Sequence, residues 1–456
     1  MGSFYVENFG CRATQADGAA LERQFRDRGL ERAASANQAE VVVLNTCTVP
    51  AAADQDARAA IRRIRRQNPA CQIVVTGCYA QRAPEEIAAL PGVTQVIGNS
   101  HKHELVKIAL PNPSAGFAND VGRTASGEGV FVSDIFAHTE LLAAPVFDAA
   151  NERTRPNLKV QDGCDNRCSF CVIPYVRGQS RSLPLDQILR EIRTLGDAGY
   201  REVVISGINL GRWGRDLSPS SSQVRPHRFE DLIRSILAET SLEKLRISSV
   251  EPMDWSGELI RLVAESPRIA KHAHVPMQSA SDRILRLMHR KYRPWHYRDK
   301  IEKIHAAMPT AAIGADVMVG FPGETDADFE QTRSMIDALR FTYLHVFTYS
   351  ARPGTPAASM PNQIPVHIAR ERNRILRELA AEKHQAFMQS FVGKNIAVIS
   401  LRASEDSQSA SSSFLSTDCL TDNYLKLRLT GCHEPNRWLT AQVDRIEHGT
   451  LVGTLT

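Results

Sequence analysis

The chain has 456 residues, of which 43% are hydrophobic and 23% charged, with a net charge of +4. This length suits about two to four domains, and the composition is that of a globular protein rather than of a fibrous or disordered chain. No run of about 18 apolar residues predicts a membrane span, and no signal peptide is expected. With nine cysteines and no export signal, the sequence predicts a cytoplasmic protein whose thiols bind metal rather than form disulfides.

Residues 1–110 alternate apolar runs with helical patterns, which predicts an N-terminal α/β domain with a parallel sheet and helical crossovers. Runs such as EVVVLN are expected in strands that are covered on both faces. Four strands are predicted here: Ser3–Phe9, Glu40–Asn45, Gln72–Thr76 and Val93–Ile97. Helices are predicted at Ala16–Gly29 and Ala51–Gln67.

A cysteine follows each of the first three predicted strands, at Cys11, Cys47 and Cys78. Because the carboxyl ends of parallel strands meet at one edge of an open sheet, where ligands bind, we expect the three thiols to converge. Three thiolates can hold three irons of a [4Fe–4S] cluster and leave the fourth iron open. The alternative is that they are small buried hydrophobes, as free cysteines often are, and we interpret Cys71 in that way.

Residues 111–152 contain a Pro-Asn-Pro-Ser turn among many small polar residues and are predicted to be a linker. The alternation of strands and helices then restarts at Leu158 and persists to about residue 360. Six strands are predicted, each followed by a helix: Leu158–Gln161, Glu202–Ser206, Leu245–Ser249, Ala273–Met277, Ala315–Val319 and Tyr343–Thr348. Six such units predict a partial (β/α)6 barrel over residues 153–388, two units short of a closed eight.

The loop after the first barrel strand holds three cysteines, Cys164, Cys168 and Cys171, spaced C-x3-C-x2-C. Thiolates at this spacing can hold a [4Fe–4S] cluster with one open iron. Zinc is the alternative, but a zinc site would usually need a fourth Cys or His nearby, and none lies close in the sequence. The loop falls at the carboxyl rim of the barrel, where the active sites of barrel enzymes form.

Four further residues are candidates to contact a ligand at this rim: Phe170, Gly207, Ser249 and Gln278. Phe170 lies just before the last cysteine, and the others lie at the exits of predicted strands. Gly207 would let the backbone approach a ligand closely, because it has no side chain. The alternative for the polar residues is a structural part in caps and turns.

Residues 389–456 change in character, and their short alternating runs predict a small β-barrel resembling an OB-fold. Strands are predicted at Ile396–Leu401, Leu425–Leu429, Leu439–Ile446 and Leu451–Leu455, with a serine-rich turn at Ser407–Ser413. Period-two alternation places Tyr424, Lys426 and Arg428 on one face. An aromatic ring with two cations suits RNA binding by stacking and phosphate contact, and a solvated face is the alternative.

Several motifs together resemble the radical S-adenosylmethionine (SAM) methylthiotransferases over nearly the whole chain. They are Gly10-Cys11, Asn45-Thr46-Cys47-Thr48, Thr76-Gly77-Cys78-Tyr79-Ala80-Gln81, the run Gly163–Cys171 with Ile173-Pro174-Tyr175, and Tyr349–Pro356. The resemblance implies an N-terminal cluster domain, a radical SAM barrel and a C-terminal TRAM domain. The sequences around Cys47 and Cys78, with Arg12 after the first cysteine, resemble the branch that modifies threonylcarbamoyladenosine in tRNA. Thr14 departs from that branch, which commonly has Asn at this position.

The resemblance implies an enzyme that adds a methylthio group to C2 of N6-threonylcarbamoyladenosine, 3′ of the anticodon. Cys164, Cys168 and Cys171 would hold the cluster that binds SAM, with Phe170, Gly207, Ser249 and Gln278 as SAM contacts. Cys11, Cys47 and Cys78 would hold an auxiliary [4Fe–4S] cluster. Expected partners are the tRNA, a flavodoxin-type or ferredoxin-type electron donor and a sulfur source, with no membrane.

Three other functions stay open from the sequence. The same chemistry could act on isopentenyladenosine in tRNA or on an aspartate of a ribosomal protein. A non-catalytic iron–sulfur protein that binds RNA is the alternative of a different class.

Overall fold

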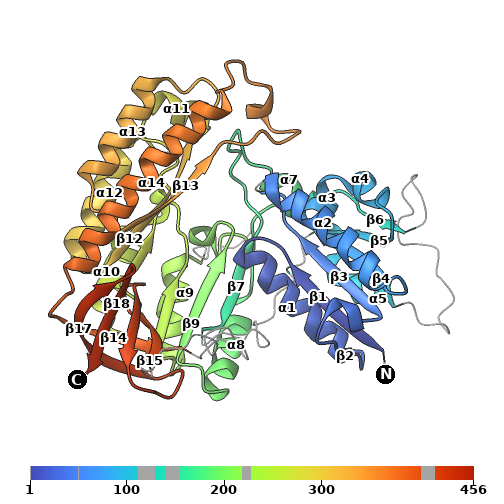
Figure 1. Ribbon diagram of the computed structural model, residues 1–456, viewed down its shortest axis with the longest axis horizontal. Helices are drawn as coiled ribbons and strands as arrows, with labels where there is room; N and C mark the ends of the chain where they lie inside the picture. The colour runs from blue at the N-terminus through green and yellow to red at the C-terminus, as the bar shows by residue number, and fades with distance from the viewer. Residues whose placement is uncertain are drawn as a thin grey trace.

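The computed structural model describes residues 2–49, 51–110, 129–138, 141, 155–217, 227–401 and 416–456. Most of the predicted linker 111–152 and the predicted serine-rich turn Ser407–Ser413 lie outside the described residues. In Figure 1 the N-terminal α/β domain (blue) lies beside a half-open barrel (green to orange), and a small β-barrel (red) lies at one end of it. No described helix is long and apolar enough to cross a bilayer.

The N-terminal domain is a parallel sheet with the strand order β2-β1-β3-β4-β5-β6. Its strands are β1 (Ser3–Asn8), β2 (Glu31–Arg32), β3 (Val41–Thr46), β4 (Gln72–Gly77), β5 (Val93–Gly98) and β6 (Val130–Phe131). Its helices are α1 (Arg12–Asp27), α2 (Ala51–Gln67), α3 (Cys78–Arg82), α4 (Pro84–Ala88) and α5 (Leu105–Ala109). The chain reverses its winding between β1 and β3, which is where an open α/β sheet binds ligands.

Helices cover both faces of this sheet, as the apolar strand sequences predict. Val41 and Val43 pack with Phe25 of α1 on one face, whereas Val42 and Leu44 pack against α2 on the other. Successive side chains of a strand point to opposite faces, so an unbroken apolar run is buried on both. Cys71 is 4% exposed and belongs to the core, as interpreted from the sequence.

The second domain is a partial barrel of six parallel strands in the order β7-β9-β10-β11-β12-β13. Hydrogen bonding divides it into two sheets, β10-β9-β7-β8 and β11-β12-β13, and isolated bridges at Leu245–Ile269 and Ser249–His274 connect them. The strands are β7 (Asn157–Asp162), β8 (Arg181–Ser182, antiparallel to β7), β9 (Glu202–Gly207), β10 (Lys244–Ile247), β11 (His272–His274), β12 (Ala312–Val319) and β13 (Tyr343–Thr348).

Helices follow the barrel strands and cover the outside of the barrel. They bury the strand side chains that point outward, among them Val203, Ile205, Leu245 and Ile313. They are α8 (Leu185–Asp197), α9 (Phe229–Glu239), α10 (Gly257–Glu265), α11 (Asp282–Leu287), α12 (Pro294–Ala307) and α13 (Asp326–Ala338), whereas the short helix α7 (Ile173–Arg177) packs against α3 of the N-terminal domain. The side chains at the alternate strand positions face the interior of the barrel. The predicted partial (β/α)6 barrel is therefore confirmed.

A long helix, α14 (Val366–Gln389), packs on β13 and leads into the C-terminal domain (Figure 1). That domain is a closed barrel with the strand order β14-β15-β16-β18-β17. Its strands are β14 (Asn395–Ser400), β15 (Ser416–Thr421), β16 (Lys426–Thr430), β17 (Trp438–Glu447) and β18 (Thr450–Leu455). Strand β15 was not predicted from the sequence, because its polar sequence STDCLT has few apolar residues to mark a strand.

The C-terminal barrel is attached to the amino-terminal ends of the barrel strands. Asn423 Nδ2 donates to the carbonyl of Thr310 just before β12 (2.9 Å), and Asn436 Nδ2 donates to the carbonyl of Gly199 just before β9 (2.6 Å). The predicted cofactor site lies at the opposite, carboxyl ends of these strands.

Candidate active site

The structure brings Cys11, Cys47 and Cys78 together at the carboxyl edge of the N-terminal sheet. They follow β1, β3 and β4, and Cys78 opens helix α3. Gly10 (φ 98°) packs against Cys47 so closely that a Cβ atom there would lie 2.4 Å from the Cβ of Cys47. Burial, and then the neighbouring Cys78 and Cys11, raise the pKa of Cys47 to about 12. The three thiols therefore lie close enough to disfavour one another's ionisation.

Hydrogen-bond donors surround these thiols. The backbone N–H of Val49 donates to Cys47 Sγ (3.4 Å), and Asn99 Nδ2 donates to Cys78 Sγ (3.6 Å). Thr14, the residue that departs from the family pattern, lies 3.6 Å from Cys11 Sγ through its hydroxyl. Donors aimed at sulfur stabilise thiolates that are bound to metal.

The second set of thiols lies in the loop after β7. Gly163 (φ 71°) leads into it, and a Cβ atom there would lie 1.8 Å from the carbonyl oxygen of Gln179, so this position requires glycine. Asn209 Nδ2 donates to Cys164 Sγ (3.6 Å), and Arg290 Nη1 donates to Cys168 Sγ (3.3 Å). Burial, and then Cys168, raise the pKa of Cys171 to about 12.

Both triads fit an iron–sulfur cluster better than a single metal ion. In the described part of the chain, one group of three or more His, Cys, Asp or Glu residues has its ligand atoms within 4.8 Å of one another, and it contains no cysteine. Tetrahedral zinc with Zn–S bonds of about 2.3 Å would draw its sulfurs to within about 4 Å. Thiols that are spaced more widely than this suit a cubic cluster.

The two triads approach each other across a small apolar cluster. Cys78 packs with Val172, Ile173 and Val176 of the α7 region, and Cys164 and Cys171 pack against the same cluster. Asn99 also donates to the carbonyl of Val176 (2.7 Å), which ties the first triad to the second domain. Both sets of thiols therefore lie at the contact between the two domains, around one apolar cluster.

A buried group of five charges joins the two domains beside the first triad. We call it the interdomain charge group; it consists of Asp17 and Lys102 from the N-terminal domain with Lys159, Asp162 and Arg177 from the barrel. Asp17 accepts from Lys102 (3.0 Å), Arg177 (3.1 Å) and Lys159, and Asp162 accepts from Lys159 (2.8 Å) and Arg177 (2.9 Å). All five side chains are at most 8% exposed.

The interdomain charge group carries three cations and two anions. Burial by itself would raise the pKa of Asp17, but Lys102, Lys159 and Arg177 lower it to about 2. The pKa of Arg177 is raised well above its usual value, against the effect of burial, by Asp162, Cys78, Asp17 and Cys11. The excess positive charge therefore lies beside the thiols of the first triad. No sequence motif marks this group, although a lysine in the buried run LKVQD is a weak signal.

The predicted SAM contacts all lie near the carboxyl rim, and contact with SAM stays a prediction. Phe170 lies edge-on to Phe321, with ring centroids 6.5 Å apart. Gly207 closes against Gln161, whose Oε1 would lie 2.8 Å from an added Cβ. Ser249 pairs with β11, and Gln278 (φ 62°) donates its backbone N–H to the carbonyl of Asp316 (2.8 Å).

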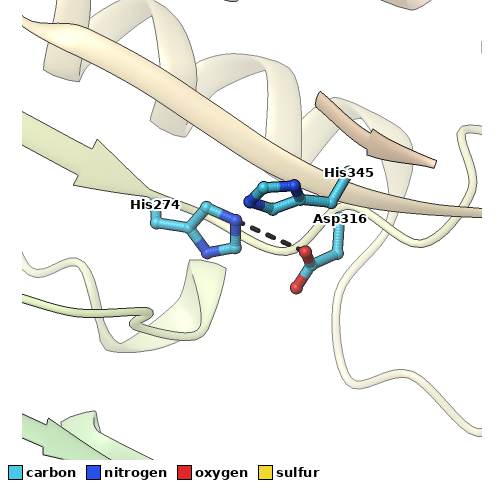
Figure 2. Close-up of side chains that lie close together, drawn as sticks. All are labelled: His274, Asp316 and His345. Carbon is cyan, nitrogen blue, oxygen red and sulfur yellow. Dashed lines mark ion pairs between the residues drawn. The ribbon is translucent and has the colours of Figure 1, made fainter. Parts of the chain in front are cut away.

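Polar side chains that the sequence analysis missed line the barrel interior. His274 Nε2 lies 3.4 Å from Asp316 Oδ1, and the His274 and His345 rings are 5.6 Å apart (Figure 2). One layer nearer the amino ends, His272 Nε2 and Tyr343 Oη are hydrogen-bonded at 2.7 Å. Burial, and then Arg246, lower the pKa of His272 well below its usual value, so this imidazole is neutral. These interior residues could have been predicted from the sequence, because polar side chains occur there at every second position of otherwise buried strands.

Tyr424 has different surroundings from Lys426 and Arg428, and RNA contact by these three residues stays a prediction. Lys426 and Arg428 are exposed on β16, whereas Tyr424 precedes this strand in a turn with φ 71°. Its ring lies 5.0 Å from that of His272, and its hydroxyl accepts from Arg12 Nη2 (3.4 Å). Burial still alternates along this segment, with Leu425, Leu427 and Leu429 in the core, but the barrel domain covers Tyr424 and leaves Lys426 and Arg428 exposed.

Comparison with known proteins agrees with this architecture. Two family models match, the Uncharacterized protein family UPF0004 over residues 3–98 and the Radical SAM superfamily over residues 158–336. Among solved structures, the radical S-adenosylmethionine methyltransferase TsrM from Kitasatospora setae aligns with a TM-score of 0.57 at 16% identity, covering 78% of this chain and 75% of that chain. The likeness concerns the fold. Fold and cysteine loop together define a radical SAM enzyme, which uses SAM and a [4Fe–4S] cluster.

Relatives that match most of the chain identify the family within the radical SAM superfamily. "Threonylcarbamoyladenosine tRNA methylthiotransferase MtaB" of Aquifex aeolicus is 35% identical, covering 94% of this chain and 97% of that protein. The protein of the same name from Bacillus subtilis is 34% identical, with 95% and 92% covered. "tRNA-2-methylthio-N(6)-dimethylallyladenosine synthase" of Novosphingobium aromaticivorans is 33% identical, with 86% of each covered. The chain belongs to the radical SAM methylthiotransferase family.

Proposed function

We propose that the protein adds a methylthio group to C2 of N6-threonylcarbamoyladenosine, the modified adenosine 3′ of the anticodon in tRNA. The observation that carries this proposal is the approach of two thiol triads across one apolar cluster. Relatives named for this reaction are 31–35% identical to the chain.

We further propose that Cys11, Cys47 and Cys78 hold an auxiliary [4Fe–4S] cluster, in addition to the SAM cluster on Cys164, Cys168 and Cys171. When bound, the cluster on Cys164, Cys168 and Cys171 would supply the electron for reductive cleavage of SAM to methionine and a 5′-deoxyadenosyl radical, and the auxiliary cluster would supply the position from which sulfur is delivered. A radical is needed because the C2–H bond is unactivated. The chain supplies binding, orientation and exclusion of side reactions.

The described side chains support separate tasks at the two triads. Arg290 orients and shields Cys168 and is itself held by Glu251, so the SAM loop has a fixed cationic neighbour. Arg177 and Lys102 offset negative charge at the auxiliary thiols from the other side. Val172 and Ile173 are buried between the triads, so apolar side chains separate the two sets of thiols. The adenosine must leave its stack to reach the thiols, as sequence-specific RNA recognition generally requires.

The proposed partners are the tRNA, an electron donor and a sulfur source. Lys426 and Arg428 are exposed on β16 and suit phosphate contacts with the tRNA, with Tyr424 nearer the barrel. The reaction also needs an electron donor, of flavodoxin or ferredoxin type, and a sulfur source. A tRNA substrate is met in the cytoplasm, which supports that location.

Analysis of tRNA nucleosides from a deletion strain tests the proposed reaction. Loss of the methylthio-threonylcarbamoyl nucleoside, with the methylthio-dimethylallyl nucleoside retained, is expected, and the reverse pattern would assign the other substrate. Iron and sulfide analysis of anaerobic protein tests the clusters, with about eight irons per chain expected from two cubes. Four irons would remove the auxiliary cluster.

A further inference from the structure

Arginine gathers where the three domains meet, at the amino-terminal side of the barrel interior. Arg155 (3.4 Å) and Arg246 (2.6 Å) both bind Glu202, which is completely buried. Arg12, the first residue of α1, adds a third guanidinium whose charge acts on Arg155, His272 and Tyr343. Arg155 and Arg246 thus share one buried carboxylate, and Arg12 lies near this pair.

Arg12 is the guanidinium that stays available to a ligand. Its side chain is exposed, and no carboxylate of the described residues lies within ion-pair distance of it. Its side chain donates from Nη2 to Tyr424 Oη at 3.4 Å. An exposed cation whose side-chain partner among the described residues is a neutral hydroxyl is suited to bind an anion of the substrate.

Two other domains hold Arg12 in place. The ring of Tyr424 lies 5.0 Å from that of His272 and 5.4 Å from the guanidinium carbon of Arg246. Asn157 Nδ2, at the start of β7, donates to the backbone carbonyl of Arg12 (3.3 Å). The C-terminal barrel and the SAM barrel therefore both set the position of a residue from the N-terminal domain.

The chemistry of the base connects this position to the reaction. C2 of adenine and C6, which carries the N6 substituent, are both bonded to N1, so they lie on one edge of the ring. If C2 of the base faces the thiols of Cys11, Cys47 and Cys78, the N6 substituent therefore lies on the same side of the base, toward the residues next to these thiols. Arg12 directly follows Cys11, so its backbone lies beside the first triad while its guanidinium extends to Tyr424.

We propose that Arg12 binds the carboxylate of the threonylcarbamoyl group and so selects this substrate, with Tyr424 as its positioning residue. This inference rests on the proposed function. A dimethylallyl group is uncharged and gains nothing from a guanidinium. Relatives that are named for the two substrates have nearly equal identity to this chain, 35% and 33%, so overall identity does not separate the two substrates.

The test uses reconstituted, anaerobic full-length enzyme and three forms of one tRNA. They carry threonylcarbamoyladenosine, the same nucleoside with its carboxylate converted to a primary amide, or dimethylallyladenosine. The variants are Arg12→Gln, Arg12→Lys and Tyr424→Phe, with Arg28→Gln, exposed at the other end of α1, as the matched control. Readouts are tRNA affinity, KM, kcat, and iron content, which reports any damage at Cys11.

Arg12→Gln is expected to weaken binding and raise KM for the threonylcarbamoyl tRNA by about tenfold to a hundredfold, the range for a charge-assisted hydrogen bond. Binding of the amide and dimethylallyl forms should be unchanged, as should iron content and SAM cleavage without tRNA. Arg12→Lys should recover part of the loss, Tyr424→Phe should cause a smaller rise in KM, and Arg28→Gln should match wild type.

Equal losses on all three tRNAs would assign Arg12 to a phosphate and overturn the inference, as would unchanged binding by Arg12→Gln. Failure of the wild-type enzyme on threonylcarbamoyl tRNA, with activity on the dimethylallyl form, would instead refute the proposed function. The two failures are therefore distinguishable.

Discussion

Removing the charge of Asp17 is expected to destabilise the contact between the first two domains strongly. In Asp17→Asn, Lys102, Lys159 and Arg177 remain buried with Asp162 as the one carboxylate among them. The pKa of Asp17 is lowered from 3.8 to about 2, which corresponds to about 2 kcal/mol of stabilisation. Because a lowered carboxyl pKa stabilises above the unfolded pKa, this contribution is complete at pH 7 and is lost as the pH falls from about 4 toward 2.

The substitution should cost more than this, because it also leaves cations unpaired. Breaking a buried ion pair by removing one partner costs about 3–5 kcal/mol, a change of roughly a hundredfold to a thousandfold or more in the unfolding equilibrium. Urea unfolding of the anaerobic holoprotein at pH 7.5, followed by circular dichroism, measures it. Asp186→Asn is the matched control, since Asp186 pairs with Arg190 (2.6 Å) on the exposed face of α8 and should change stability little.

A second variant separates charge balance from general damage. Asp17→Asn combined with Lys102→Met removes one of the unpaired cations, so the double variant should be more stable than Asp17→Asn alone. Wild-type stability of Asp17→Asn, or a double variant that is less stable than the single one, would refute this account of the interdomain charge group.

Four further outcomes are expected. Cys168→Ala should abolish release of 5′-deoxyadenosine from SAM by reduced enzyme, and unchanged release would contradict its assignment to the SAM cluster. Cys47→Ala should retain SAM cleavage and lose methylthiolation; formation of product would remove the auxiliary site. Combined Lys426→Ala and Arg428→Ala should weaken tRNA binding and reduce the slope of log affinity against log salt by about 1.4, at about 0.7 per phosphate contact, so an unaltered slope excludes this face. Arg290→Met removes a donor to Cys168 Sγ and should lower the midpoint potential of the SAM cluster in an EPR titration, whereas an unchanged potential would exclude that influence.

Local sequence patterns were enough to predict the N-terminal α/β domain and the partial barrel. Alternation of apolar runs with helical patterns predicted the N-terminal sheet and six barrel strands, because hydrogen-bonded elements repeat with periods of two and 3.6 residues. The convergence of Cys11, Cys47 and Cys78 followed from the same reasoning, since each terminates a parallel strand. Where the pattern was weak, as in β15 (STDCLT), the prediction failed.

The sequence by itself determined which residues could hold metal and which segments form the three domains, because spacing and periodicity are properties of neighbouring residues. Only the tertiary structure decided which charges compensate one another. Asp17 and Arg177 are 160 positions apart, and Arg12 and Tyr424 are 412 apart, yet both pairs are in contact. Electrostatic energy depends on distance and burial in space, and neither is encoded in a local pattern.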